Sequence, residues 1–203
     1  MDSKPAKPVD GFAAFSVERL ASLSDGVFAV AMTLLAYNIH IPIGPLNEAG
    51  LRGALARMVP AVMALVLSFF AAVMFWMGHQ RLLGMMRQSG RIIYPPSFIL
   101  LLLIILLPIT TNLYGTFGAT PSIALLYSVN LAGIALAQLF LSFWLVREEV
   151  PAQMSRRQVL AVPIYVSGVF VAAAITSIFS PWASQFIWFG AFAAPLIQRM
   201  TSA

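Results

Sequence analysis

The sequence predicts an all-α integral membrane protein, a bundle of six membrane-spanning helices. Of its 203 residues, 60% are hydrophobic and only 9% are charged, whereas a soluble domain carries about 25% charged residues. The apolar residues also gather in six long runs, which lack the polar alternation of membrane β-strands. A bilayer core of about 30 Å requires roughly 20 apolar residues per helix, which is about the length of each run.

The six runs are separated by segments that carry proline, glycine or charge. The expected helices span residues 19–41, 54–81, 92–114, 121–146, 158–179 and 182–197. Residues 1–18 are polar, and the first apolar run contains an aspartate, unlike the apolar part of a cleavable signal peptide. The sequence shows no convincing internal repeat. We therefore expect a polar N-terminus over residues 1–18 and a single-repeat, six-helix transmembrane domain over residues 19–200.

Basic residues gather in alternate connections between these helices. They precede the first helix and lie between helices two and three and between helices four and five, at Lys4, Lys7, Arg19, Arg81, Arg87, Arg91, Arg147, Arg156 and Arg157. Basic loops remain in the cytoplasm, so both termini are expected there. This distribution accounts for the net charge of +5 without a nucleic-acid partner. Because no organellar targeting signal is evident, the expected location is a bacterial plasma (inner) membrane.

The residue types argue against an enzyme. Cysteine is absent, and the two histidines lack the neighbouring carboxylates that would complete a metal site. No hydrolase or nucleotide-binding motif is present. We therefore expect no catalytic activity, no cofactor and no resident metal ion.

The first expected helix is unusual because Ser24 and Asp25 interrupt its apolar sequence. A charge near the middle of a membrane helix costs about 2.5–3.5 kcal/mol on insertion scales. Such a helix is better packed within protein than exposed to lipid. We therefore expect Asp25 to be buried and to require a partner.

An apolar stripe lies elsewhere on the same helix. At about 100° per residue, Val30, Leu34 and Tyr37 fall within about 60° of one another, and Thr33 lies on their flank. Asp25 lies roughly 120–140° from Val30. From periodicity alone, the stripe is interpreted first as core packing and second as a functional surface.

The end of the second helix offers partners for Asp25. The expected topology places His79 on the same side of the membrane as Asp25, and either His79 or Arg19 can neutralise the acid. We expect Arg19, Ser24, Asp25, Trp76 and His79 to form a polar network that positions the first helix. The alternative is a proton-coupled transporter or proton channel in which Asp25 and His79 relay protons.

The third helix contains Pro108, which removes a backbone donor and can bend the helix. Thr110, Thr111 and Asn112 follow within one turn. Their side chains are expected to satisfy freed carbonyl groups or to bond a neighbouring helix.

Three short motifs resemble those of the transmembrane protein 175 family, which comprises lysosomal potassium channels and bacterial relatives. The family motifs R-x-x-x-F-S-D, F-W-x-x-H and P-F-x-T correspond here to Arg19-x-x-x-Leu23-Ser24-Asp25, Phe75-Trp76-x-x-His79 and Pro108-Ile109-x-Thr111. They occur in the family's order within the first 112 residues. Leucine and isoleucine stand where the family prefers phenylalanine in the first and third motifs.

This resemblance implies a potassium-permeable channel built as a homotetramer, with the first helix of each subunit around a central pore. The family's constriction corresponds to Val30 and Leu34, and to Tyr37 where the family usually has leucine. Thr33 resembles a threonine that lies beside the ion path. The expected partners are permeating potassium ions, the lipid bilayer and three further copies of the chain.

Overall fold

The computed structural model describes residues 17–37, 39, 47–86, 93–118, 120–148 and 154–202, and all regular structure within them is helical. The elements are α1 (Val17–Tyr37), α2 (Glu48–Met85), α3 (Tyr94–Phe117), α4 (Pro121–Glu148), α5 (Arg156–Phe179), α6 (Pro181–Gly190), η2 (Ala191–Ala193) and α7 (Ala194–Ser202). Of the predicted N-terminal segment 1–18, residues 1–16 lie outside the described residues, as do Lys4, Lys7, Arg87 and Arg91, whereas Val17 and Glu18 already belong to α1.

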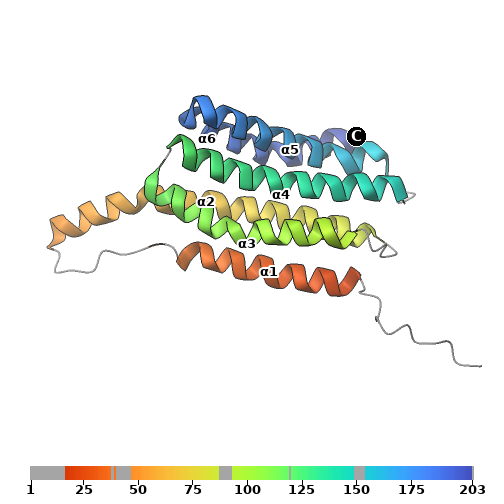
Figure 1. Cartoon of the computed structure of the whole chain (residues 1–203), viewed down its shortest axis with the longest axis horizontal. Helices are drawn as coiled ribbons and strands as arrows, with labels where there is room; N and C mark the ends of the chain where they lie inside the picture. The colour runs from red at the N-terminus through yellow and green to blue at the C-terminus, as the bar shows by residue number, and fades with distance from the viewer. Residues whose placement is uncertain are drawn as a thin grey trace, which may run out of the picture.

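The helices form an elongated bundle with α1 at one edge. In Figure 1, α2 and α3 lie beside α1, and α4, α5 and α6 lie beyond them. Helices α1 to α5 are long and apolar enough to cross a membrane, as judged by length and composition. The expectation of a multi-helix membrane protein is therefore confirmed.

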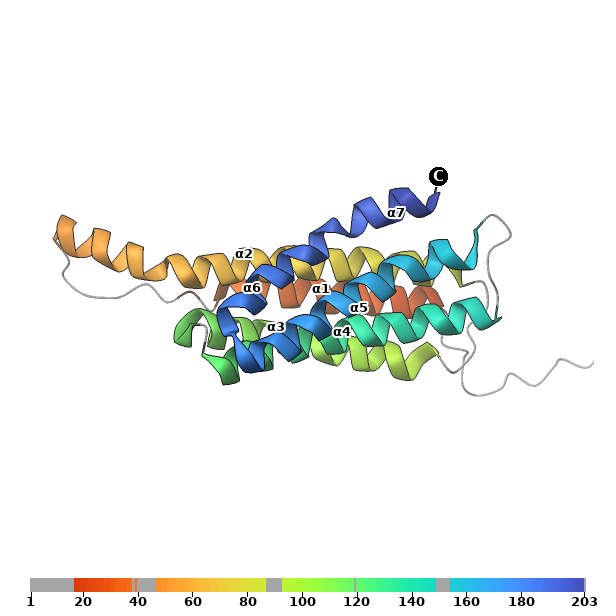
Figure 2. The ribbon, with the colours of Figure 1, turned by 90° about the horizontal axis from the view of Figure 1, so that it is seen from above.

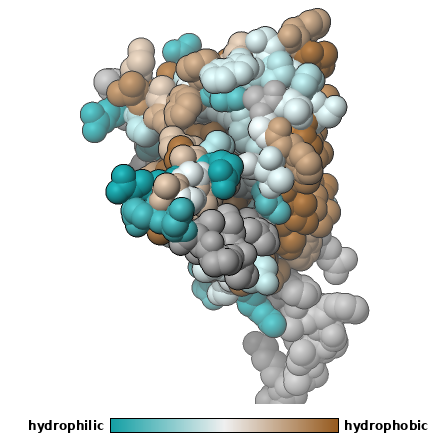
Figure 3. All heavy atoms as spheres, turned by 90° about the vertical axis from the view of Figure 1, so that its left-hand side faces the viewer, coloured by the Kyte–Doolittle hydropathy of each residue, from teal (hydrophilic) through white to brown (hydrophobic). Residues whose placement is uncertain are grey.

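Helix α2 begins earlier than the sequence predicted. Its N-cap Asn47 accepts a hydrogen bond from the backbone N–H of Gly50, and the Arg52 guanidinium pairs with Glu48 at 3.0 Å. These interactions extend the helix through glycines that weaken a helical prediction. Because Gly115 near the end of α3 packs against Ala61, the first turns of α2 project beyond α3 (Figure 1). Figure 3 views this end, where a hydrophilic cluster lies beside an apolar flank.

The sixth expected helix is interrupted. Residues 181–202 are helical, but the 3-10 turn η2 separates α6 from α7. Pro195 cannot donate a backbone hydrogen bond to Ala191 one turn earlier, and the Ala194 N–H donates to the Ala191 carbonyl in its place. The Tyr165 hydroxyl donates to the preceding carbonyl, that of Gly190, at 2.8 Å. In Figure 2 the pieces follow one another along one oblique course. Neither α6 nor α7 has the length of a membrane span, so the count of six spans stays a prediction.

An aromatic cluster attaches α6 to the bundle. The Trp188 ring is 2% exposed, and its centroid lies 4.8 Å from that of Tyr127 and 5.1 Å from that of Tyr114. Its indole N–H donates to the Ser128 hydroxyl at 3.1 Å. The cluster therefore combines apolar burial with a satisfied polar group, as a buried tryptophan requires.

Polar side chains near Pro108 connect α3 to its neighbours. The Thr111 hydroxyl lies 2.8 Å from the Ser68 hydroxyl of α2, which in turn lies 2.8 Å from the Tyr127 hydroxyl of α4. The Thr110 hydroxyl donates to Asn130 of α4 at 3.3 Å. The predicted interhelical role is thus observed for both threonines.

Close contact between α2 and α3 depends on Gly115. A Cβ at this position would lie 3.0 Å from the Ala61 Cα. We expect Gly115→Ala to push the helices apart and to destabilise the protein by about 1–3 kcal/mol. Gly168→Ala is the matched control, because a Cβ there would meet nothing within 4 Å. Thermal unfolding in detergent would measure both, and equal melting temperatures for the two variants would contradict the prediction.

Candidate pore helix and its polar network

The buried face of α1 packs against α2 and α3. It consists of Leu20, Ser24, Phe28, Ala31 and Leu35. At about 100° per residue, these positions fall within an arc of about 80°. One side of α1 is therefore covered by its own chain, and the rest of the helix surface is open.

The predicted stripe lies on the open surface. Val30, Leu34 and Tyr37 are 57%, 44% and 80% exposed, so they are not core residues of the single chain. Thr33 is also exposed, and its hydroxyl donates to the Val30 carbonyl at 2.7 Å. This hydrogen bond leaves the acceptor side of the Thr33 oxygen available on the open surface.

Asp25 lies at the edge of the contact between α1 and α2. Its carboxylate accepts a hydrogen bond from the Trp76 indole N–H at 2.8 Å and another from the Gln80 amide. In the single chain Asp25 is exposed, so its expected burial within protein stays a prediction for the assembly. The reason for this exposure is geometric, because Asp25 lies about 100° from the centre of the buried arc of α1.

His79 is fully buried and bonds Ser24 rather than Asp25. Its Nε2 lies 3.1 Å from the Ser24 hydroxyl, which also lies 2.8 Å from the Leu20 carbonyl. The Ser24 hydroxyl has one proton to donate. When that proton is donated to the Leu20 carbonyl, the Ser24 oxygen accepts a hydrogen bond from the protonated Nε2 of His79. The Nδ1 atom then carries a lone pair, and it has no hydrogen-bond partner among the described residues.

Two described hydrogen bonds join four of the five predicted network residues in adjacent pairs. Asp25 bonds Trp76, and Ser24 bonds His79. No described hydrogen bond joins Asp25 to His79 directly. The fifth predicted residue, Arg19, lies in the first turn of α1 with its side chain exposed.

Sequence reasoning missed Gln80. Its position four residues after Trp76 places both side chains on the same face of α2, and that spacing was the signal available in the sequence. Within the described residues, no three His, Cys, Asp or Glu side chains come close enough to hold a metal ion.

The fold and the site define a membrane-embedded helical bundle whose polar first helix is tied to the second. Comparison with known proteins finds similarity to one particular family. The family described as endosomal/lysosomal potassium channel TMEM175 matches residues 19–108. The family resemblance carried by the three motifs is therefore confirmed. The members of this family are ion channels and not enzymes, which agrees with the prediction from the sequence that the chain has no catalytic activity.

Individual relatives agree with this family. The chain is 32% identical to a potassium channel of Chamaesiphon minutus over 59% of each protein, and 28% identical to a potassium channel of Streptomyces collinus over 62% of each. The sequence matches thus span about three fifths of these relatives. The crystal structure of a lysosomal potassium-selective channel TMEM175 homolog from Chamaesiphon minutus superposes with a TM-score of 0.74 and 26% identity, covering 92% of this chain and 98% of that one.

Proposed function

We propose that this chain is one subunit of a potassium-permeable channel in a bacterial plasma membrane. Four copies surround a central pore, and α1 of each copy lines it. The channel domain comprises residues 19–200, crosses the membrane six times and has both termini in the cytoplasm. The potassium channels among its relatives and the TMEM175 family match support this function over the proton-coupled alternative.

The position of α1 is the observation that carries the proposal. This helix contains the acid that is costly in lipid, yet it lies at the edge of the bundle with one side open. A single chain has too few polar residues to line an aqueous path of its own. A fourfold assembly covers the open side of α1 and turns it toward the symmetry axis.

The constriction is formed by rings of Val30 and Leu34, with Tyr37 at the next position along the stripe. Narrow apolar rings resist wetting, so an ion must shed most of its water to pass. Thr33 lies beside the stripe and offers an oxygen to the passing cation. Asp25, held by Trp76 and Gln80, is on the other flank of the buried arc and positions α1.

Two measurements on the purified protein test this function. Reconstituted liposomes with an outward potassium gradient are expected to release potassium faster than empty liposomes, and faster than they release sodium under a matched sodium gradient. The mass of the detergent-solubilised particle is expected to equal four chains. A monomeric particle or an absence of potassium flux would contradict the proposal, because one chain alone has no plausible pore.

A further inference from the structure

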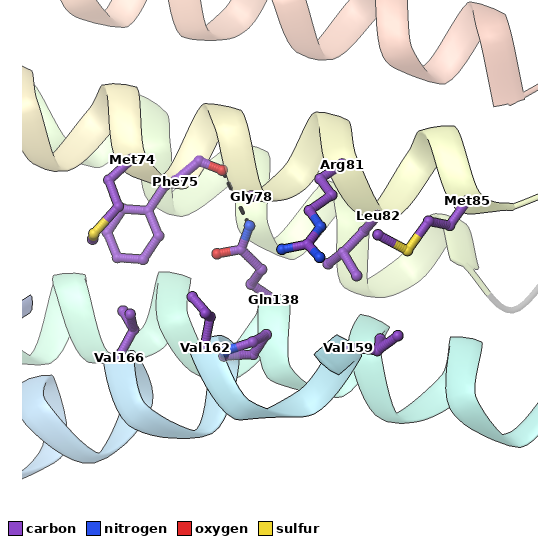
Figure 4. A pocket seen from close by; sticks show the side chains of 11 residues that line it. Met74, Phe75, Gly78, Arg81, Leu82, Met85, Gln138, Val159, Val162 and Val166 are labelled. Carbon is purple, nitrogen blue, oxygen red and sulfur yellow. Dashed lines mark hydrogen bonds between the residues drawn. The ribbon is translucent and has the colours of Figure 1, made fainter. Parts of the chain in front are cut away.

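A small cavity lies between α2, α4 and α5, near the end of the bundle where α2 ends and α5 begins. Its volume is about 50 Å³. Figure 4 shows its largely apolar walls, which include Met74, Leu82, Met85, Val159 and Val162. Two polar side chains, Arg81 and Gln138, interrupt these walls. The cavity is on the opposite side of α2 from the contacts that hold α1.

The side chain of Gln138 is held in a fixed position in the cavity wall. It is 7% exposed, and its amide N–H donates to the Phe75 carbonyl at 3.1 Å. The amide fits only because residue 78 is glycine, since a Cβ there would lie 2.4 Å from the Gln138 nitrogen. The polar side of the cavity is therefore fixed by close packing.

In the part of the chain that the structure describes, Arg81 is the only charged residue that lines this cavity. Its half-buried side chain extends along the cavity in Figure 4. Among the described residues, it has no hydrogen bond and no ion pair. A guanidinium is always charged and carries five N–H donors. Its open side can bond water, whereas the part of the guanidinium that borders the cavity can bond a polar or anionic group held there.

The charges around the cavity favour the binding of an anion. Arg147 near the end of α4 and Arg156 and Arg157 at the start of α5 are exposed at the same end of the bundle. Together with Arg81 they place four guanidinium groups at this end, and no carboxylate is among the described residues that line the cavity. Clustered positive charge attracts anions to a partly enclosed site.

We propose that this cavity binds a phosphate group, with Arg81 as its principal ligand-binding residue. The planar guanidinium matches phosphate oxygens with two parallel hydrogen bonds. Basic pockets between membrane helices near the bilayer surface bind anionic lipid headgroups, and free phosphate offers the same oxygens. The cavity accepts one phosphate-sized group, so the acyl chains of a lipid remain outside it.

Lipid-dependent thermal stability tests this site without requiring conduction. The protein is placed in phosphatidylcholine nanodiscs, in nanodiscs that also contain phosphatidylglycerol, and in phosphatidylcholine nanodiscs with added inorganic phosphate. Phosphatidylglycerol is expected to raise the melting temperature of the wild type. Arg81→Gln is expected to need at least about tenfold more of this lipid for half of the gain. Arg199→Gln, which removes an exposed arginine of α7, is expected to keep the wild-type response.

The outcomes separate the sources of phosphate and the role of Arg81. A gain with inorganic phosphate in phosphatidylcholine identifies free phosphate as a ligand, whereas a gain only with phosphatidylglycerol identifies the lipid. Arg81→Lys keeps the charge and serves as the second variant if Arg81→Gln does not fold; it is expected to bind more weakly than the wild type. Equal responses of wild type and both Arg81 variants, or no gain in either arm, would overturn the proposal. These results do not depend on whether the protein conducts potassium.

Discussion

Replacing Val30 or Leu34 with asparagine is expected to increase potassium flux through reconstituted protein. Asparagine places an amide where the proposed constriction has an apolar side chain, so the ring wets more readily and the ion loses less hydration. A barrier lowered by about 1.4 kcal/mol raises the rate tenfold, and we expect an increase on the order of tenfold for each substitution. Discrimination between potassium and sodium is expected to fall in the same variants. Liposome flux under potassium and sodium gradients measures both effects.

The control must be as exposed as Val30 but lie on another helix. Ile175 of α5 is 56% exposed, compared with 57% for Val30, so Ile175→Asn introduces the same amide at a similar exposure. We expect its flux to equal that of the wild type. If all three asparagine variants conduct alike, α1 does not line the pore.

Removing the indole donor to Asp25 is expected to loosen α1 and weaken the assembly. Trp76→Phe keeps most of the ring but leaves the carboxylate with one fewer hydrogen bond at the helix contact. In the proposed tetramer the neighbouring subunits cover the open side of α1, and a carboxylate shielded from water is destabilised by the loss of a donor. We expect a melting temperature lower by several degrees and partial dissociation into smaller particles. Trp144→Phe is the control, because no described hydrogen bond depends on that indole.

The same network distinguishes the channel from a proton-coupled transporter. If Asp25 serves to hold α1, Asp25→Asn lowers stability, and the flux that remains keeps the pH dependence of the wild type. If Asp25 and His79 relay protons, Asp25→Asn abolishes coupling to pH in a protein with unchanged melting temperature and stoichiometry. Flux at several pH values, measured with particle mass on the same preparations, separates the two.

Much of the architecture could be predicted because it depends on composition and periodicity. Long apolar runs fix the five longest helices to within a few residues at most ends. The adjacent Ser24 and Asp25 mark α1 as unusual for a membrane helix. The motifs predict that Trp76 and His79 of α2 contact these two residues. These are local patterns, which a single sequence displays directly.

The remaining features depend on contacts between distant segments. The start of α2 depends on an asparagine cap that overcomes two glycines, and the break after α6 depends on Pro195 together with the Tyr165 hydroxyl. The pairing of His79 with Ser24 rather than Asp25 follows from the rotation of α1 against α2. The room that Gly78 leaves for Gln138 is visible only after α2 and α4 are packed together.

One stretch of α2, from Phe75 to Leu82, makes contacts in two directions. Trp76, His79 and Gln80 bond α1, while Gly78 and Arg81 border the cavity toward α4 and α5. Because one continuous helix carries both sets of contacts, we expect a group bound in the cavity to affect how α1 packs against α2. Substitutions on opposite sides of this stretch should therefore have non-additive effects, and a double-mutant cycle between Trp76 and Arg81 would measure the energy of that link.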